Sequence, residues 1–232
     1  MADRCLLYYI TDRSQFPGDE LERRRALLAK VSEAASAGVE YIQLRERDLS
    51  ARELEMLTRD ALAAVRDNPP LETGNRELRA GRELRTRILI NSRTDVALAA
   101  GANGVHLRAQ DITPDEVREV LRACARWPFP ADHFVVAASC HSREDVKRAQ
   151  SEAADFAVFA PVFGKSSAPG TPPAGLAALR GACQEKIPVF ALGGIALGNA
   201  ASCLDSGAAG IAAIRLFQEN RIGDVARALR TL

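Results

Sequence analysis

Short runs of β-branched and other apolar residues alternate with longer Ala- and Leu-rich amphipathic segments along the chain. These two patterns predict strands and helices respectively. We expect strands at 6–11, 40–46, 87–92, 104–107, 134–139, 156–160, 188–192 and 210–214. We expect helices near 20–37, 50–66, 93–100, 113–126, 142–151, 174–185, 197–206 and 217–231. Strict alternation of this kind predicts a parallel sheet with helices on its outer face.

Eight strand–helix units are the number that closes a barrel, and 232 residues is close to the ~250 typical of one. We therefore predict one α/β domain over 1–232, folded as a (βα)8 TIM barrel. An open doubly wound sheet would carry a glycine fingerprint after its first strand, whereas the chain there reads "TDRSQFPGDE". The polar stretch 67–85 is interpreted as a surface insertion, with an oligomer or partner contact as the alternative.

The charge balance excludes some classes of partner. The formal net charge is +1, from 31 basic and 30 acidic side chains, so it favours neither nucleic acid nor a membrane surface. No apolar run approaches the ~18 residues of a membrane span, and the N-terminus lacks a signal-peptide pattern. Five scattered cysteines without a CxxC pair favour free thiols in a reducing compartment. We therefore expect a cytoplasmic protein.

The active site of such a barrel lies at the C-terminal ends of its strands. Gln43, Arg45 and Arg47 alternate there and share one face of the second strand. They either bind a ligand or form an internal salt-bridge layer with Glu46, Asp12 or Asp111. Further candidates for substrate binding follow other strands: Asn91, Ser139, Lys165 and Ser167. The last two lie in "FGKSSAPGTPPAG", which is either a plain turn or a flap over a charged ligand.

Two glycines end the seventh strand in "ALGGI" and lead into a helix. Glycine permits a close approach of the backbone, and the N–H groups of a helix N-terminus favour phosphate. The loops after the seventh and eighth strands are where barrels commonly bind phosphate. The sequence therefore predicts a phosphate site formed by Gly193, Gly194, Ile214 and Arg215.

Two histidines lie in or directly after predicted strands. His141 follows the fifth strand in "ASCHS", where it could exchange protons near neutral pH, or could simply pack beside a helix start. His106 lies inside "GVHL", and we expect it to have a structural role.

Six motifs, in this order, resemble the thiamine phosphate synthase and TenI (thiazole tautomerase) superfamily: "YYITDR", "GVEYIQLRERDLS", "ILINSRTDVALAAGANGVHLRAQD", "AASCHSREDVKRA", "ADFAVFAPVF" and "IPVFALGGI". The resemblance covers nearly the whole chain apart from 67–85 and implies a (βα)8 barrel. In this family, synthases join a pyrimidine carried as its diphosphate to thiazole phosphate with Mg²⁺, releasing pyrophosphate. Tautomerases aromatise thiazole phosphate carboxylate and need no metal. The implied partner is a phosphorylated thiazole, and family members are commonly homo-oligomers.

The residues of this chain depart from the synthase pattern at several positions. Synthases have lysine at position 47, where this chain has arginine, and an aspartate that helps to bind Mg²⁺ at position 92, where it has serine. Asp111 matches the other carboxylate of the synthase site. Ala168 stands where synthases have a lysine that touches the diphosphate, and Lys165 lies three residues earlier.

Because hard cations prefer several oxygen ligands, a lone carboxylate argues against Mg²⁺. We therefore expect a metal-free thiazole tautomerase, in which His141 shuttles the proton and Arg45 binds the substrate carboxylate. The second reading is a divergent synthase with Mg²⁺ at Asp111. The third is a regulatory paralogue without catalysis.

Overall fold

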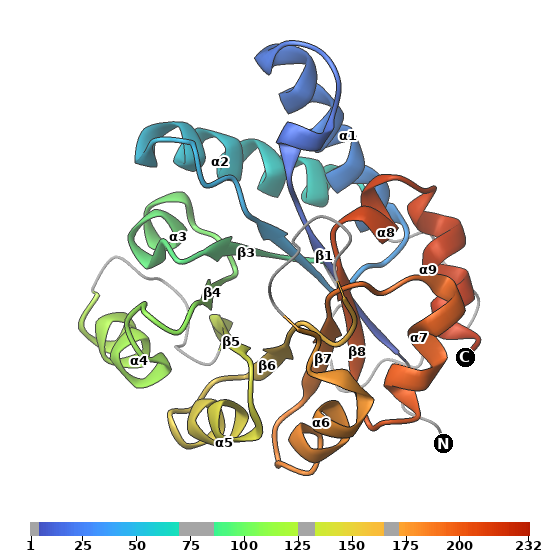
Figure 1. Ribbon diagram of the computed structural model, residues 1–232. Coiled ribbons are helices and arrows are strands. Elements are labelled where there is room, and N and C mark those ends of the chain that lie inside the picture. Colours follow the sequence, from blue (N-terminus) through green and yellow to red (C-terminus); the bar gives the residue numbers. More distant parts are fainter. Residues whose placement is uncertain (1–4, 70–85, 125–132, 165–171) are drawn as a thin grey trace.

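The structure, a computed structural model, describes residues 5–69, 86–124, 133–164 and 172–232. Eight parallel strands close into a barrel in sequence order, and the last strand pairs with the first (Figure 1). Helices surround the barrel on its outside (Figure 1). The predicted (βα)8 TIM barrel is therefore confirmed. Residues 70–85 of the predicted insertion lie outside the described residues.

The strands are β1 (Leu6–Ile10), β2 (Tyr41–Leu44), β3 (Arg87–Asn91), β4 (Gly104–Leu107), β5 (Val135–Cys140), β6 (Phe156–Phe159), β7 (Val189–Leu192) and β8 (Gly210–Ala213). The helices are α1 (Glu20–Ser36), α2 (Ala51–Asp67), α3 (Thr94–Ala100), α4 (Pro114–Ala123), α5 (Arg143–Ser151), α6 (Gly175–Ala182), α7 (Leu197–Leu204), α8 (Arg215–Gln218) and α9 (Ile222–Arg230). A short 3₁₀ helix, η1 (Arg13–Gln15), follows β1. No described helix is long and apolar enough to cross a membrane.

Local sequence determines where several helices begin. Ser50 accepts from the backbone N–H of Glu53 and the Glu53 carboxylate accepts in return, which closes a capping box on α2. Thr113 and Glu116 do the same for α4, where Pro114 occupies the first helical position. All five cysteines are free, as predicted, and burial raises the pKa of the Cys140 thiol to about 12. That thiol is therefore protonated and unreactive at neutral pH.

The inside of the barrel is filled by aromatic side chains from several strands. The rings of Tyr8 and Phe156 meet edge to face at 5.5 Å, and those of Phe156 and Phe190 lie 4.7 Å apart. Val158 and Leu89 belong to the same buried cluster. The barrel is thus a packed core with no pore, and it holds the residues that follow its strands in fixed positions.

The single helix predicted at 217–231 is wrong, because the segment forms two helices, α8 and α9. Gln218 is buried at the end of α8. Its side-chain amide oxygen accepts from the Tyr9 hydroxyl at 3.1 Å and from the backbone N–H of Asp12 at 3.2 Å. The Glu33 carboxylate then accepts from the backbone N–H of Ile222 at 2.6 Å, where α9 begins. These contacts with α1 and β1 turn the chain between the two helices.

Gly104 lies where β4 approaches β5 closely, since a Cβ added there would meet the Val135 carbonyl oxygen at 2.1 Å. We predict that Gly104→Ala lowers the free energy of unfolding by about 1–3 kcal/mol or more, because the strands must shift. Gly223→Ala is the control, since nothing lies within 4 Å of the added Cβ in α9. Urea denaturation measures both variants, and equal stability of the two would contradict the prediction.

Candidate active site

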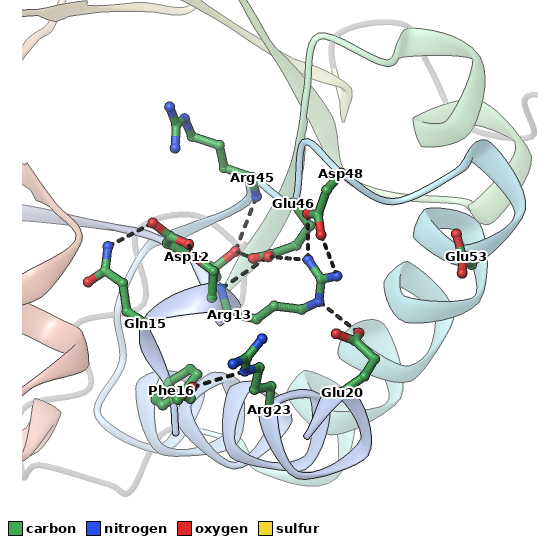
Figure 2. Close-up of polar contacts among 12 residues, drawn as sticks. Asp12, Arg13, Gln15, Phe16, Glu20, Arg23, Arg45, Glu46, Asp48 and Glu53 are labelled. Atoms are coloured by element: carbon green, nitrogen blue, oxygen red, sulfur yellow. Dashed lines mark hydrogen bonds and ion pairs between the residues drawn. The ribbon is translucent and has the colours of Figure 1, made fainter. Parts of the chain in front are cut away.

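The buried carboxylate of Glu46 joins the ends of β1 and β2 (Figure 2). It accepts from the Thr11 hydroxyl at 2.5 Å, from the backbone N–H of Arg13 at 3.0 Å and from the Arg13 guanidinium at 3.2 Å. Thr11 in turn accepts from the backbone N–H of Arg45 at 3.1 Å. We call Thr11, Arg13 and Glu46 the Glu46 cluster. It fixes the backbone from which Arg45 extends.

Arg13 is also bound on its outer side. Its guanidinium donates to both oxygens of Asp48, at 2.7 and 2.8 Å, and to Glu20 at 2.8 Å. The hydrogen bond from Arg13 lowers the pKa of Asp48. The predicted salt-bridge alternative, in which Glu46 pairs with the donors of the second strand, is therefore not what the structure shows. Glu46 pairs with Arg13 instead.

The guanidinium groups of Arg45 and Arg47 have no hydrogen-bond or ion-pair partner among the described residues. Burial and then the neighbouring Arg47 lower the pKa of Arg45; Arg108 adds to this effect, whereas Asp12 and Glu46 oppose it. Figure 2 shows the Arg45 guanidinium pointing away from the Glu46 cluster. A half-buried cation that its neighbours repel is stabilised by an anionic ligand.

Two cavities adjoin these arginines. The first, of about 240 Å³, is lined by Asp12, Ser14, Arg45, Glu46, Arg47 and Asp48. The second, of about 170 Å³, is lined by residues at and after the ends of β2, β3 and β4, which include Arg47, Asn91, Ser92, Arg93 and Arg108. Arg93 is already paired, since it donates to both oxygens of Asp95 at 2.8 and 2.6 Å. Arg47 and Glu46 line both cavities. Because Arg13 pairs with Glu46 and Asp48, we call the surroundings of Arg45, Arg47 and Arg108 the cationic region.

Asp111 is the carboxylate beside the second cavity. It accepts from the backbone N–H of Arg108 at 2.7 Å, from the Arg108 guanidinium at 3.1 Å and from Ser92. Burial raises the pKa of Asp111, but these hydrogen bonds outweigh it and lower the pKa below its usual value. The Asn91 amide donates to the Ser92 hydroxyl at 3.1 Å. Ser92 has a φ of 63°, a conformation that is rare outside glycine and that clusters at functional sites.

The resemblance to synthases implies Mg²⁺, and the donors beside the second cavity fit this ion in part. Among the described residues, no group of three or more His, Cys, Asp and Glu side chains could hold a metal ion. Mg²⁺, however, is commonly bound by one or two carboxylates, with substrate phosphates and water completing the octahedron. Asp111 and the Ser92 hydroxyl therefore fit Mg²⁺ only when a phosphorylated substrate supplies further oxygens.

His141 lies exposed after β5 with its ring held in place. Its Nδ1 lies 2.6 Å from the carbonyl oxygen of Ala160, so in the neutral ring Nδ1 carries the hydrogen. The Nε2 lone pair is then available to a ligand. The backbone N–H of His141 donates to the Asp145 carboxylate at 3.0 Å. This arrangement is compatible with the predicted proton shuttle.

The glycines after β7 have a packing role of their own. Gly193 and Gly194 have φ values of 103° and 64°. A Cβ on Gly193 would lie 2.8 Å from Pro161, and one on Gly194 would lie 2.9 Å from Phe163. The loop therefore requires glycine with or without a ligand. The phosphate site at Gly193, Gly194, Ile214 and Arg215 stays a prediction, although Ile214 and Arg215 do start α8 at the same end of the barrel.

The remaining predicted residues differ in their accessibility. Gln43 is buried, and its amide donates to the Tyr8 hydroxyl inside the barrel at 3.0 Å. Ser139 is half-buried at the end of β5 and hydrogen-bonds His106 at 2.7 Å. Lys165 and Ser167 lie outside the described residues, as does Ala168. Sequence reasoning missed the Glu46 cluster and the partners of His106, because both join residues from different strands.

The structure is thus a closed (βα)8 barrel in which no described residue pairs with the guanidinium groups of Arg45 and Arg47, just after β2. The chain belongs to the thiamine monophosphate synthase family, whose model matches residues 7–217. A relative from Geobacter sulfurreducens, provisionally named thiamine-phosphate synthase, is 40% identical over 210 residues, covering 90% of this chain and 84% of its own. The thiamine-phosphate synthase of Thermus thermophilus is 34% identical over 218 residues, which cover 93% of this chain and 90% of its own.

A solved structure gives the same result. The thiamine phosphate pyrophosphorylase of Pyrococcus furiosus superimposes with a TM-score of 0.73 at 27% identity, covering 99% of this chain and 96% of its own. The predicted superfamily is thereby confirmed. The comparisons also support the prediction of a TIM-barrel enzyme of thiamine biosynthesis. These comparisons do not single out the TenI-type branch that we expected.

We predict that Arg13→Met lowers the free energy of unfolding by about 3–5 kcal/mol, because it leaves the Glu46 carboxylate buried without its cation. Arg227→Met is the matched control. Its ion pair with Asp224 is exposed, with 76% and 58% of the two side chains accessible, and its loss should cost less than about 1 kcal/mol. Chemical denaturation measures both, and similar costs would show that the Glu46 cluster does not hold this end of the barrel.

Proposed function

We propose that this chain is a thiamine-phosphate synthase, which joins a pyrimidine carried as its diphosphate to thiazole phosphate and releases pyrophosphate. The observation that carries this proposal is that the guanidinium groups of Arg45 and Arg47, near Arg108, have no partner within the part of the chain that the structure describes. The names of the relatives support it as well. This order reverses the expectation from sequence, which placed the tautomerase first because of Ser92 and Ala168.

The number of cations favours a diphosphate over a single carboxylate. Arginine does not lose its proton in proteins, so Arg45 and Arg47 repel each other at every accessible pH. A diphosphate carries more than one negative charge and several acceptor oxygens, and it can engage both guanidinium groups in charge-assisted hydrogen bonds. The thiazole carboxylate of the tautomerase reaction would occupy only one of them.

The same cations suit the chemistry of the transfer. The bond to the diphosphate breaks as the bond to the thiazole forms, so negative charge builds up on the departing oxygen. Fixed donors aimed at that oxygen stabilise the transition state without reorganisation. The Glu46 cluster supports this role, because it holds the backbone N–H of Arg45 through Thr11.

The second substrate would bind across the barrel. In a closed barrel of eight strands, β7 and β8 lie opposite β3 and β4. A thiazole phosphate anchored at Gly193, Gly194 and Arg215 would therefore face a diphosphate bound near Arg47 and Asp111. Holding two reactants in this way can supply a large part of the rate enhancement.

Mg²⁺, where bound, would be held by Asp111 and Ser92 with the diphosphate and would neutralise part of the diphosphate charge. The hydrogen bonds to Asp111 keep its pKa low, so the carboxylate is ionised at neutral pH. The single carboxylate of this chain makes the metal depend on the substrate for its other ligands. Metal and diphosphate should therefore bind together.

We predict that the purified protein forms thiamine phosphate from the pyrimidine diphosphate, thiazole phosphate and Mg²⁺, and that EDTA abolishes the reaction. Arg47→Ala should lower kcat/KM by about 10²-fold, because it removes a donor to the developing charge. Arg93→Ala is the control, since its guanidinium lines the same cavity but is already bound by Asp95. A wild-type protein that makes no thiamine phosphate would refute the proposal, and an equal loss in both variants would remove Arg47 from it.

Thiazole tautomerase is the second candidate, and the held ring of His141 with its available Nε2 favours it. A tautomerase only moves protons, so one side chain that transfers a proton and one phosphate anchor would suffice. The same protein preparation decides between the two. If it aromatises thiazole phosphate carboxylate without metal, and His141→Asn loses that activity while wild type makes no thiamine phosphate, the tautomerase replaces the synthase.

A further inference from the structure

A continuous line of hydrogen bonds crosses the inside of the barrel and ends at its mouth. The Gln43 amide donates to the Tyr8 hydroxyl at 3.0 Å, and the Tyr8 hydroxyl lies 2.9 Å from Nδ1 of His106. Nε2 of His106 lies 2.7 Å from the hydroxyl of Ser139. The first three side chains are buried, and Ser139 is half-buried at the end of β5. The rings of Tyr8 and His106 are stacked, with centroids 5.8 Å apart.

We propose that Tyr8 and His106 are positioning residues that orient the Ser139 hydroxyl so that its hydrogen is donated to a hydrogen-bond acceptor of the substrate. This inference rests on the proposed function in one respect, namely that Ser139 faces the substrate. Neither Tyr8 nor His106 touches substrate in this account, because both are closed off inside the barrel.

The direction of the line follows from counting hydrogens. The Tyr8 oxygen accepts from Gln43, so its own hydrogen must find another acceptor, since a buried hydroxyl without one is costly. Among the described residues, Nδ1 of His106 is the acceptor within reach. Because Nδ1 accepts, the ring hydrogen is on Nε2 and is donated to Ser139. The hydrogen of Ser139 then points away from His106 and toward the mouth.

This direction of the hydrogen bonds requires that the His106 ring is neutral, because a charged imidazolium has two donors and could not accept from Tyr8. Burial is the main cause that lowers the pKa of His106 to about 3; the nearby Arg45 contributes to this shift and Asp111 opposes it. At neutral pH the ring therefore has one donor and one acceptor.

If every hydrogen bond in this line ran in the opposite direction, the Ser139 hydroxyl would lose its free hydrogen. If Tyr8 donated to Gln43, then Nδ1 of His106 would carry the hydrogen and Nε2 would accept from Ser139. The Ser139 hydrogen would be used inside the protein and would not be available to a ligand. The two arrangements therefore differ in which nitrogen of His106 is protonated.

Nitrogen-15 NMR of the His106 ring distinguishes them without any substrate. We predict hydrogen on Nε2 in the wild-type protein and a changed pattern of ring shifts in Tyr8→Phe, which removes the donor to Nδ1. Tyr9→Phe is the matched control, since it deletes another buried hydroxyl of β1, one that donates to Gln218 at 3.1 Å. Hydrogen on Nδ1 in wild type, or unchanged shifts in Tyr8→Phe, would overturn the proposal.

A double-mutant cycle tests whether Tyr8 acts through Ser139. Tyr8→Phe should lower kcat/KM for thiamine phosphate formation by about tenfold, and should have no further effect in a Ser139→Ala background. Additive losses, or the same loss in Tyr9→Phe, would show that Tyr8 contributes only stability. If the wild type made no thiamine phosphate, the proposed function would fail, whereas the NMR result would still decide the direction of the line.

Discussion

The ion pair between Arg13 and Glu46 is the contact on which the mouth of this barrel depends. Glu46 lies in sequence between Arg45 and Arg47, and it would be their natural neutralising partner. Arg13, from the end of the neighbouring strand, takes that carboxylate instead, with Thr11 as a second donor. Glu46 therefore forms no ion pair with the two arginines on either side of it. A buried pair of this kind is expensive to form, so its presence here is better explained by the site than by stability alone.

The rest of the site is arranged around this cationic region. Asp111 and Ser92 lie beside it at the ends of β3 and β4, and the loops after β7 and β8 lie across the barrel. The line from Gln43 to Ser139 runs between these regions inside the barrel. In the account proposed here, this end of the barrel holds two anions and presents one oriented hydroxyl. Two phosphorylated substrates make fuller use of this arrangement than one.

The fold could be predicted because its evidence is local and repeated. Each strand and each helix has its own hydrophobic pattern, and eight strand–helix units are the number that closes a barrel. The division of the last helix could not be predicted, because Gln218 is held by Tyr9 and Asp12, which are distant in sequence. The sequence showed the alternation of Gln43, Arg45 and Arg47. It did not show that Gln43 hydrogen-bonds Tyr8 inside the barrel, whereas the arginines do not take part in that contact. That difference depends on Tyr8 and Arg13, whose positions follow only from strand pairing.

The choice between tautomerase and synthase rested, at the level of sequence, on single positions such as Ser92. The identity to named synthases along the whole chain favours the synthase.

The central claim is that Arg45 and Arg47 form a site for a diphosphate. Isothermal titration with inorganic pyrophosphate and Mg²⁺ tests it without either organic substrate. We predict saturable binding that weakens by at least about tenfold in the Arg45→Met/Arg47→Met double variant and is retained in Arg215→Met, which lies across the barrel. Pyrophosphate binding that is unchanged in the double variant, or lost only in Arg215→Met, would contradict the account.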